Sequence, residues 1–382
     1  MQPRSSLAFK RDPSLLRGWD VVRDAESYDA IIDDKLFLGN LSAAESPQLL
    51  NRLGITHVLS VCPDYLKVSE NLKHLSLPML DDEHFDILEH LPTTCQFIQE
   101  ALNSGGRVLI HCVMGISRSV TVVCAYLMFS QNISTAQAMR LVRARRPRGR
   151  PNYNFIRQLQ VFSACNHNVS PEAPPYISWK AQQDFDEAHS LRVIDGMPIL
   201  TGQLFLSFDF PSNRDHASAF LDHLGVTHIV SITPDHIISV AQDVLERHVH
   251  KHFIAPYTAK ESLLLALPLL CRFVDDALQT NNSRVFLHCM DDLRGGIAIC
   301  AYLMFSRQIP PAQALEILQD RIPLFDDNPT VLRHLELFEQ CQYAPSQRHP
   351  LVRAWLSNTP PQVDTSSWIG GLLDKGNWLQ TR

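Results

Sequence analysis

The fold of this chain is decided by residues 107–130, RVLIHCVMGISRSVTVVCAYLMFS. The first six residues form a short, β-rich apolar run that is typical of a buried strand. After a tight turn with one glycine, apolar residues recur at helical spacing from 117 to 130. A strand that leads into a helix, with a second strand-like run THVLSV at 56–61 and a second helical pattern at 135–144, predicts an α/β fold with the sheet in the middle.

The same pattern returns later in the chain. RVLIHC (107–112) is repeated as RVFLHC (284–289), and AYLMFSQNISTAQAMRLVRARRP (125–147) is repeated as AYLMFSRQIPPAQALEILQDRIP (301–323). The matched segments keep their order, and their spacing is far longer than the roughly 20–50 residues of repeat arrays. We therefore expect two copies of one domain in tandem.

This duplication sets the expected domain boundaries. The stretch between the copies is proline-bearing and polar, which suits a linker. The C-terminal tail contains Trp355, Trp368 and Trp378, and we interpret it as a docked or flexible terminus, with a partner-binding peptide as the alternative. The expected parts are an N-terminal extension (1–25), a first domain (26–166), a linker (167–190), a second domain (191–343) and a tail (344–382).

Composition excludes several classes of protein. The 382 residues are 45% hydrophobic and 19% charged, as in soluble globular proteins, and the net charge of −6 disfavours a nucleic-acid partner. No apolar stretch approaches the ~20 residues that span a bilayer, and the N-terminus lacks the apolar core of a signal peptide. Nine cysteines without a CxxC pair indicate reduced thiols and no metal site, so we expect an intracellular protein of the cytoplasm or nucleus.

The turn between the first strand and helix carries the chemistry. Backbone N–H groups at a helix start attract an anion, and they favour the thiolate form of Cys112 at the beginning of the turn. Arg118, six residues later, can hold two phosphoryl oxygens at once with its planar guanidinium. A thiolate and convergent donors predict nucleophilic attack on phosphorus. The predicted phosphate-binding residues are Val113, Met114, Gly115, Ile116, Ser117 and Arg118.

The departing oxygen needs a proton, which a carboxylic acid elsewhere in the fold should supply. Asp81, in LPMLDDEHFDIL, is the candidate, and Asp82 and Asp86 compete with it. Ser119 can hydrogen-bond the sulfur as it leaves in the second step. His111 can brace the loop and tune the cysteine.

The segment HCVMGISRS resembles the signature loop of the cysteine-dependent protein tyrosine phosphatases, in their dual-specificity branch. The resemblance covers most of the first copy, including LPMLDD and the helices after the loop. It implies a mixed sheet flanked by helices in each copy, and no metal or organic cofactor. It also implies that Cys112 is the nucleophile, Arg118 binds phosphate, Asp81 is general acid and then base, and Ser119 assists hydrolysis of the phosphocysteine.

The substrate expected from this resemblance is a phosphorylated protein. A tyrosine-recognition segment of the KNRY type is missing, which suits a shallow pocket that accepts phosphoserine, phosphothreonine and phosphotyrosine. The loop also lacks the extra cations of lipid-phosphate relatives. Six arginines between 140 and 150 are interpreted as a site for acidic substrate flanks, as a solvated surface or as a nuclear address.

The second copy has lost the catalytic pattern. Its loop, HCMDDLRGG (288–296), has a spacing one residue shorter and places Asp291 and Asp292 where a phosphate would lie. Gly295 replaces the serine, and Thr258 or Ala259 replaces the acid. Residues 171–345 carry 12 Lys/Arg and 22 Asp/Glu, a net charge of −10, against 13 and 13 over 25–170. We expect a pseudophosphatase domain with a structural, substrate-recruiting or partner-binding role, or a weak phosphate binder.

Two alternatives to a protein phosphatase remain open at this point. Both copies could hold phosphoproteins without turnover, as a scaffold, or the first copy could act on a non-protein phosphate ester. Cys62, at the end of the THVLSV run, is interpreted as a core thiol, with a reversible redox partnership with Cys112 as the alternative.

Overall fold

The computed structural model describes residues 25–63, 71–211, 213–235, 242–325 and 328–357. The chain divides into two compact units at residue 170, apart from 134–136, which group with the second unit. Among the described residues no helix is both long and apolar enough to span a bilayer. Trp368 and Trp378 lie outside the described residues.

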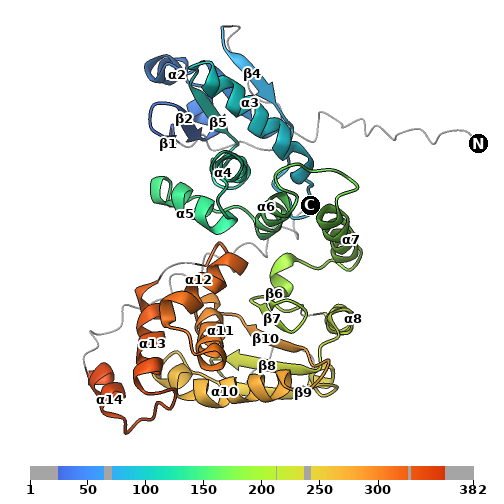
Figure 1. Cartoon of the computed structure of the whole chain (residues 1–382), viewed down its shortest axis with the longest axis vertical. Coiled ribbons are helices and arrows are strands. Elements are labelled where there is room, and N and C mark those ends of the chain that lie inside the picture. Colours follow the sequence, from blue (N-terminus) through green and yellow to red (C-terminus); the bar gives the residue numbers. More distant parts are fainter. Residues whose placement is uncertain (1–24, 64–70, 212, 236–241, 326–327, 358–382) are drawn as a thin grey trace, which may run out of the picture. The chain divides into compact units, whose positions relative to one another are not determined.

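The first unit is built on a five-stranded mixed sheet, as the sequence predicts (Figure 1). Its strand order is β1-β2-β5-β3-β4, in which only the β1–β2 pair is antiparallel. The central strands are fully buried, which explains their continuous apolar runs. The strands are β1 (Tyr28–Ile32), β2 (Leu36–Gly39), β3 (His57–Ser60), β4 (Lys73–Ser76) and β5 (Val108–His111).

Helices cover this sheet on both faces. Phe37, Val58 and Leu109 pack against the small helices α1 and α2, whereas α3 and α4 contact β5 and each other. Figure 1 shows α4 beside α3 and α6. The helices are α1 (Leu41–Ala44), α2 (Pro47–Leu53), α3 (Leu91–Asn103), α4 (Arg118–Gln131), α5 (Thr135–Arg145) and α6 (Tyr153–Ala164), with a 3₁₀ turn at Leu88–His90.

Helix α4 is the buried central helix of the first unit. Its residues from Arg118 to Met128 are all buried, which fits a sequence that is apolar on every side. It ends at Gln131, and the next residue, Asn132, adopts the left-handed conformation that asparagine tolerates. Because α4 starts directly after β5 and the Cys112 loop (residues 112–118), the core fixes both ends of that loop.

The second unit contains a sheet of the same order and strand directions, β6-β7-β10-β8-β9. Its strands are β6 (Met197–Leu200), β7 (Leu204–Ser207), β8 (His228–Thr233), β9 (Val249–Ile254) and β10 (Val285–Cys289). Its helices are α7 (Pro174–Ala188), α8 (Arg214–Leu224), α9 (Gln242–Leu245), α10 (Ser262–Leu278), α11 (Asp292–Arg307), α12 (Pro311–Arg321), α13 (Pro329–Gln340) and α14 (Pro350–Ser357), with a 3₁₀ turn at Val193–Asp195.

Two segments outside the expected domain cores are ordered into helices. The expected linker contains α7, whose Phe185 packs on the core of the second unit and stacks on His223 with ring centroids 3.7 Å apart. Part of the expected tail forms α14, where Trp355 is buried against His334 and under the Lys260 ammonium. Helix α7 carries Tyr176, Trp179 and Phe185 in an otherwise polar sequence, whereas α14 is amphipathic and buries Val352 and Trp355, and these apolar side chains explain the docking.

Candidate active site

The Cys112 loop turns sharply between β5 and α4 because of Gly115. This residue has φ +67°, a left-handed conformation that favours glycine. A Cβ atom on it would lie 2.6 Å from the carbonyl oxygen of Gly39 and 2.7 Å from Nη2 of Arg146. The loop is therefore packed too closely for any side chain at this position.

Three carbonyl groups of the Cys112 loop are bonded to groups outside it. The carbonyl of Val113 accepts from the Leu41 amide at 3.1 Å, and that of Ile116 accepts from the Arg150 amide at 2.8 Å. The carbonyl of Gly115 accepts from Nε of Arg146 at 2.7 Å. Since each trans peptide directs its N–H opposite to its C=O, these bonds turn the amides of residues 114, 116 and 117 the other way. These three carbonyl oxygens of the loop are thus hydrogen-bonded to groups outside it, and the corresponding amides point the opposite way.

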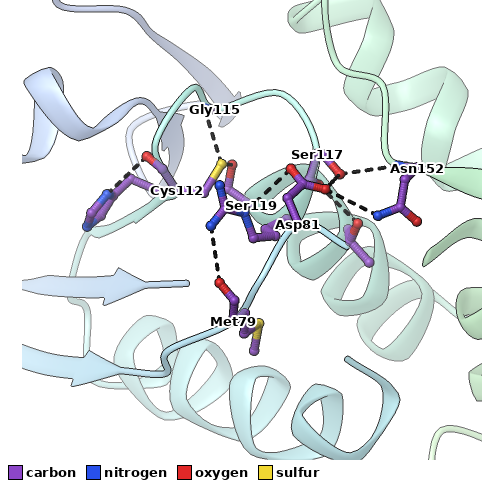
Figure 2. Close-up of polar contacts among 10 residues, drawn as sticks. Met79, Asp81, Cys112, Gly115, Ser117, Ser119 and Asn152 are labelled. Atoms are coloured by element: carbon purple, nitrogen blue, oxygen red, sulfur yellow. Dashed lines mark hydrogen bonds and ion pairs between the residues drawn. The ribbon is translucent and has the colours of Figure 1, made fainter. Parts of the chain in front are cut away.

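Cys112 sits at the start of this loop and is only 1% exposed. Its Sγ accepts a hydrogen bond from the Gly115 amide at 3.2 Å and lies 3.2 Å from Oγ of Ser119 (Figure 2). A backbone donor and a hydroxyl therefore contact the same sulfur. Both are groups that can stabilise negative charge on sulfur.

Arg118, the first residue of α4, is buried beside the Asp81 carboxylate. Its Nη1 donates to the carbonyl of Met79 at 3.1 Å, and its Nε lies 3.5 Å from Oδ2 of Asp81. Nε has no hydrogen-bond partner among the described residues, so this contact is an ion pair. The guanidinium thus keeps donor capacity in the region of the loop.

Asp81 is the acidic residue that meets the Cys112 loop. Its Oδ1 accepts from Oγ of Ser117 at 2.7 Å and from Nδ2 of Asn152 at 3.2 Å (Figure 2). The competing carboxylates serve local turns instead: Asp82 accepts from the amide of residue 84, and Asp86 accepts from that of residue 89. The geometry favours Asp81 over both.

Helix α6 holds the segment that carries Asp81. Gln158, which is fully buried, accepts from the amides of Ile87 and Leu88, each at 2.9 Å, and donates to the carbonyl of Phe85. Asn154 donates to the carbonyl of Glu83. The polar side chains of one helix thus position a loop about 70 residues away in sequence.

Sequence reasoning missed Asn152 and Arg146. Asn152 is recognisable as a helix N-cap after Pro151, but nothing in the sequence connects it with Asp81. Arg146 is one of the six clustered arginines, yet it is 1% exposed and pairs with Asp29 while holding Gly115. Arg145 pairs with Asp33 at 2.9 Å. The cluster is thus partly structural.

The remaining predicted residues lie as follows. His111 is fully buried in β5, with Nδ1 3.4 Å from the carbonyl oxygen of Cys112. Met114 is 42% exposed, whereas Ser117 is buried. Cys62 is buried after β3, and no disulfide joins any of the nine cysteines. No group of three potential metal ligands occurs among the described residues.

The corresponding Cys289 loop (residues 289–294) of the second unit has a different structure. Helix α11 begins at Asp292, two residues before Arg294, whereas α4 begins at Arg118 itself. The carboxylate of Asp291 caps α11 by accepting from the Arg294 amide at 3.1 Å. An internal carboxylate therefore takes the helix-end donor that an external anion would use.

In the second unit, burial suppresses ionisation of the Cys289 thiol, and neighbouring groups engage the Arg294 guanidinium. Burial raises the pKa of Cys289 to about 12. The Arg294 guanidinium lies 4.2 Å from the Tyr257 ring, donates to the carbonyls of Ala255 and Pro256, and lies 3.8 Å from Asp291. Both terminal nitrogens of this guanidinium are thus engaged by backbone carbonyls inside the unit.

Comparison with known proteins assigns the first unit to a family. Residues 36–165 match the family model "Dual specificity phosphatase, catalytic domain". Among curated relatives, Mpk3 of Drosophila melanogaster is 40% identical over 137 residues, 35% of this chain and 33% of that protein. Dual specificity protein phosphatase 1B of Arabidopsis thaliana is 39% identical over 34% of this chain and 79% of that protein. The human dual specificity protein phosphatase 22 is 32% identical over 42% and 89%, respectively.

A solved structure matches the same part of the chain. The Yvh1 phosphatase domain from Chaetomium thermophilum is 35% identical, with a TM-score of 0.35, over 38% of this chain and 99% of that structure. Among the curated relatives, the match spans about a third of the length of fly Mpk3, but most of the length of the Arabidopsis and human proteins.

Proposed function

The chain belongs to the family of dual-specificity protein phosphatases, and on that premise we propose that its first unit hydrolyses phosphotyrosine, phosphoserine and phosphothreonine in proteins through a phosphocysteine at Cys112. The single observation that carries this proposal is that Asp81, 36 residues before Ser117 in the sequence, meets the three groups of the Cys112 loop and the start of α4. Sγ of Cys112, Oγ of Ser119, the Arg118 guanidinium and the Asp81 carboxylate are linked to one loop by contacts of 3.5 Å or less.

The first step is nucleophilic substitution at phosphorus. The Cys112 thiolate forms the S–P bond while the bond from phosphorus to the substrate oxygen breaks. Protonated Asp81 gives its proton to the departing oxygen, a contribution of roughly 10²- to 10⁴-fold to such steps. The amides of residues 114, 116 and 117, together with Arg118, stabilise the equatorial oxygens of the phosphoryl group.

The second step returns the enzyme to its starting state. A water molecule attacks phosphorus, Asp81 takes its proton, and the S–P bond breaks to give inorganic phosphate and the Cys112 thiolate. Ser119, 3.2 Å from the sulfur, donates a hydrogen bond to the thiolate as it leaves. The exposed Met114 leaves the rim of the loop uncharged, which suits a single phosphoryl group on a protein side chain.

For the second unit we propose an inactive phosphatase-like domain that binds no oxyanion at its Cys289 loop. The Asp291 carboxylate occupies the helix-end donor, Arg294 is bonded to backbone carbonyls, and Cys289 stays a thiol. Its intact sheet supports a structural or recruiting role. The shared strand order supports an origin by duplication.

A matched pair of cysteine variants tests both proposals in the full chain. We expect Cys112→Ser to abolish hydrolysis of para-nitrophenyl phosphate and of phosphopeptides, and Cys289→Ser to leave both rates unchanged. Titration calorimetry with vanadate should find one site per chain, which Arg294→Ala does not alter. Turnover that survives Cys112→Ser would contradict the first proposal, and a second vanadate site sensitive to Arg294 would contradict the second.

A further inference from the structure

Three polar side chains extend from the same face of adjacent strands β4, β3 and β5. Ser60 pairs with His111 across β3 and β5, and Val58, two residues before Ser60, pairs with His74 across β3 and β4. Because residues two apart on a strand share a face, Ser60, His111 and His74 lie on one side of the sheet. The register of the sheet, rather than any local motif, brings them together.

These side chains form a continuous chain of hydrogen bonds. Oγ of Ser60 lies 2.6 Å from Nε2 of His111 and 2.7 Å from Nε2 of His74. Nδ1 of His111 reaches the carbonyl oxygen of Cys112. This chain of hydrogen bonds therefore connects the exposed His74, on the edge strand β4, with the first peptide of the Cys112 loop.

Only one direction of donation satisfies every member of this chain. A carbonyl oxygen can only accept, so Nδ1 of His111 must carry the proton that points at Cys112. Burial lowers the pKa of His111 to about 4, with smaller contributions from the charges of His74 and Arg118, so its ring is neutral near pH 7 and Nε2 must accept. The Ser60 hydroxyl therefore donates to His111, and Nε2–H of His74 donates to Ser60.

The second unit contains the same three residue types in the same register, but the chain of hydrogen bonds is interrupted. Ser231 pairs with His288, and Nε2 of His250 lies 3.0 Å from Oγ of Ser231. Both ring nitrogens of His288 are nevertheless buried without a hydrogen-bond partner among the described residues. The hydrogen-bond chain is therefore complete only in the unit that has the intact Cys112 loop.

We infer that Ser60 and His74 are positioning residues for the nucleophile, because they fix the tautomer and ring orientation of His111 and, through it, the first peptide of the Cys112 loop. This inference rests on the proposed role of Cys112. It adds two residues outside the loop, one of them on the exposed edge strand of the sheet.

The test compares Ser60→Ala, His74→Ala and His74→Gln with wild type in the full chain. Ser231→Ala and His250→Ala, at the matching positions of the second unit, are the controls. The readouts are kcat and KM on para-nitrophenyl phosphate, the pH dependence of iodoacetamide alkylation at Cys112 by mass spectrometry, and the unfolding temperature. The alkylation readout is independent of turnover.

We expect Ser60→Ala and His74→Ala to lower kcat roughly tenfold, less than the ~10²-fold cost of displacing a reacting group by an ångström, with KM within about twofold. The midpoint of Cys112 alkylation should move to higher pH, because a less ordered loop aligns fewer donors with the thiolate. His74→Gln keeps an Nε2–H donor and should restore both values, and the controls should match wild type.

Wild-type kcat and alkylation profiles in both alanine variants would overturn the inference, and so would a change in unfolding temperature alone. A wild-type protein that fails to hydrolyse the substrate, while its alkylation profile still responds to Ser60→Ala, would instead reject the proposed function and keep the positioning role. Equal loss in His74→Gln and His74→Ala would also overturn it.

Discussion

Replacing Gly115 with alanine tests whether the backbone path of the Cys112 loop controls catalysis. The added Cβ would lie 2.6 Å from the Gly39 carbonyl oxygen, whereas ordinary contacts begin at 3.4 Å, so the two atoms must separate by about 0.8 Å. The Gly39 oxygen cannot easily yield, because β2 is paired with β5 at this point. The loop must therefore move, and with it the Gly115 amide that donates to Sγ of Cys112.

The expected cost has two parts. A left-handed backbone with a Cβ costs about 1–2 kcal/mol, and overpacking adds about 1–3 kcal/mol, which gives a loss of about 2–5 kcal/mol in the free energy of unfolding. A displacement of this size near the nucleophile should lower kcat roughly 10- to 100-fold. The loss of activity should exceed what partial unfolding explains.

Gly105→Ala is the matched control for this variant. Gly105 also has a left-handed backbone, with φ +76°, but a Cβ there meets nothing within 4 Å. It should therefore lose only about 1–2 kcal/mol and keep full kcat. Scanning calorimetry and steady-state kinetics on para-nitrophenyl phosphate measure the two effects. If both variants lose the same stability and keep wild-type kcat, close packing at Gly115 does not shape the site.

Further predictions concern the acid and the buried histidines. Asp81→Asn should lower kcat on phosphopeptides by roughly 10²- to 10⁴-fold. Asn152→Ala removes one donor to Asp81 and should lower kcat less. Steady-state assays check which variant loses more activity. Burial lowers the pKa of His111 and His288 to about 4, below the ~6.5 of an unfolded chain, so the unfolded state binds more protons between these values. The free energy of unfolding should therefore fall as the pH drops from 7 to 5, by about 2 kcal/mol for each ring. Urea titrations of wild type and His288→Phe at both pH values should separate the contribution of His288 from that of His111. A pH-independent stability would contradict this assignment.

The strand, loop and central helix of the first unit could be predicted from sequence because each is a local pattern. The expected helix at 117–130 differs from α4 by one residue at each end, and the strand runs contain β3 and β5. The same reasoning predicts Cys112 and Arg118 as site residues because loop and helix start are contiguous in the chain. Asp81 could be named only with its neighbours as competitors, since its distance from the loop depends on tertiary structure.

Asn152 and Arg146 could not be found in this way, because their functions depend on contacts between segments far apart in sequence. An arginine in a basic cluster reads as a surface residue, yet Arg146 is buried between the Asp29 carboxylate and the Gly115 carbonyl. Removing it would leave the Gly115 carbonyl without its donor, which costs about 1–3 kcal/mol for a buried group, whereas the half-exposed Asp29 carboxylate would be solvated by water. Its position follows from where α5 ends relative to β1, and no local pattern encodes that distance.

The two units share one strand order but differ at the start of the helix that follows the cysteine loop. In the first unit, α4 begins at Arg118 without a side-chain cap. In the second, α11 begins two residues before Arg294 and is capped by Asp291. A capping carboxylate typically stabilises a helix by ~1 kcal/mol, so the second unit gains stability from a side-chain cap that α4 lacks. On the proposal that the second unit is inactive, a stabilising contact stands where a ligand would bind, which is a physical reason why such a domain can keep its fold without its chemistry.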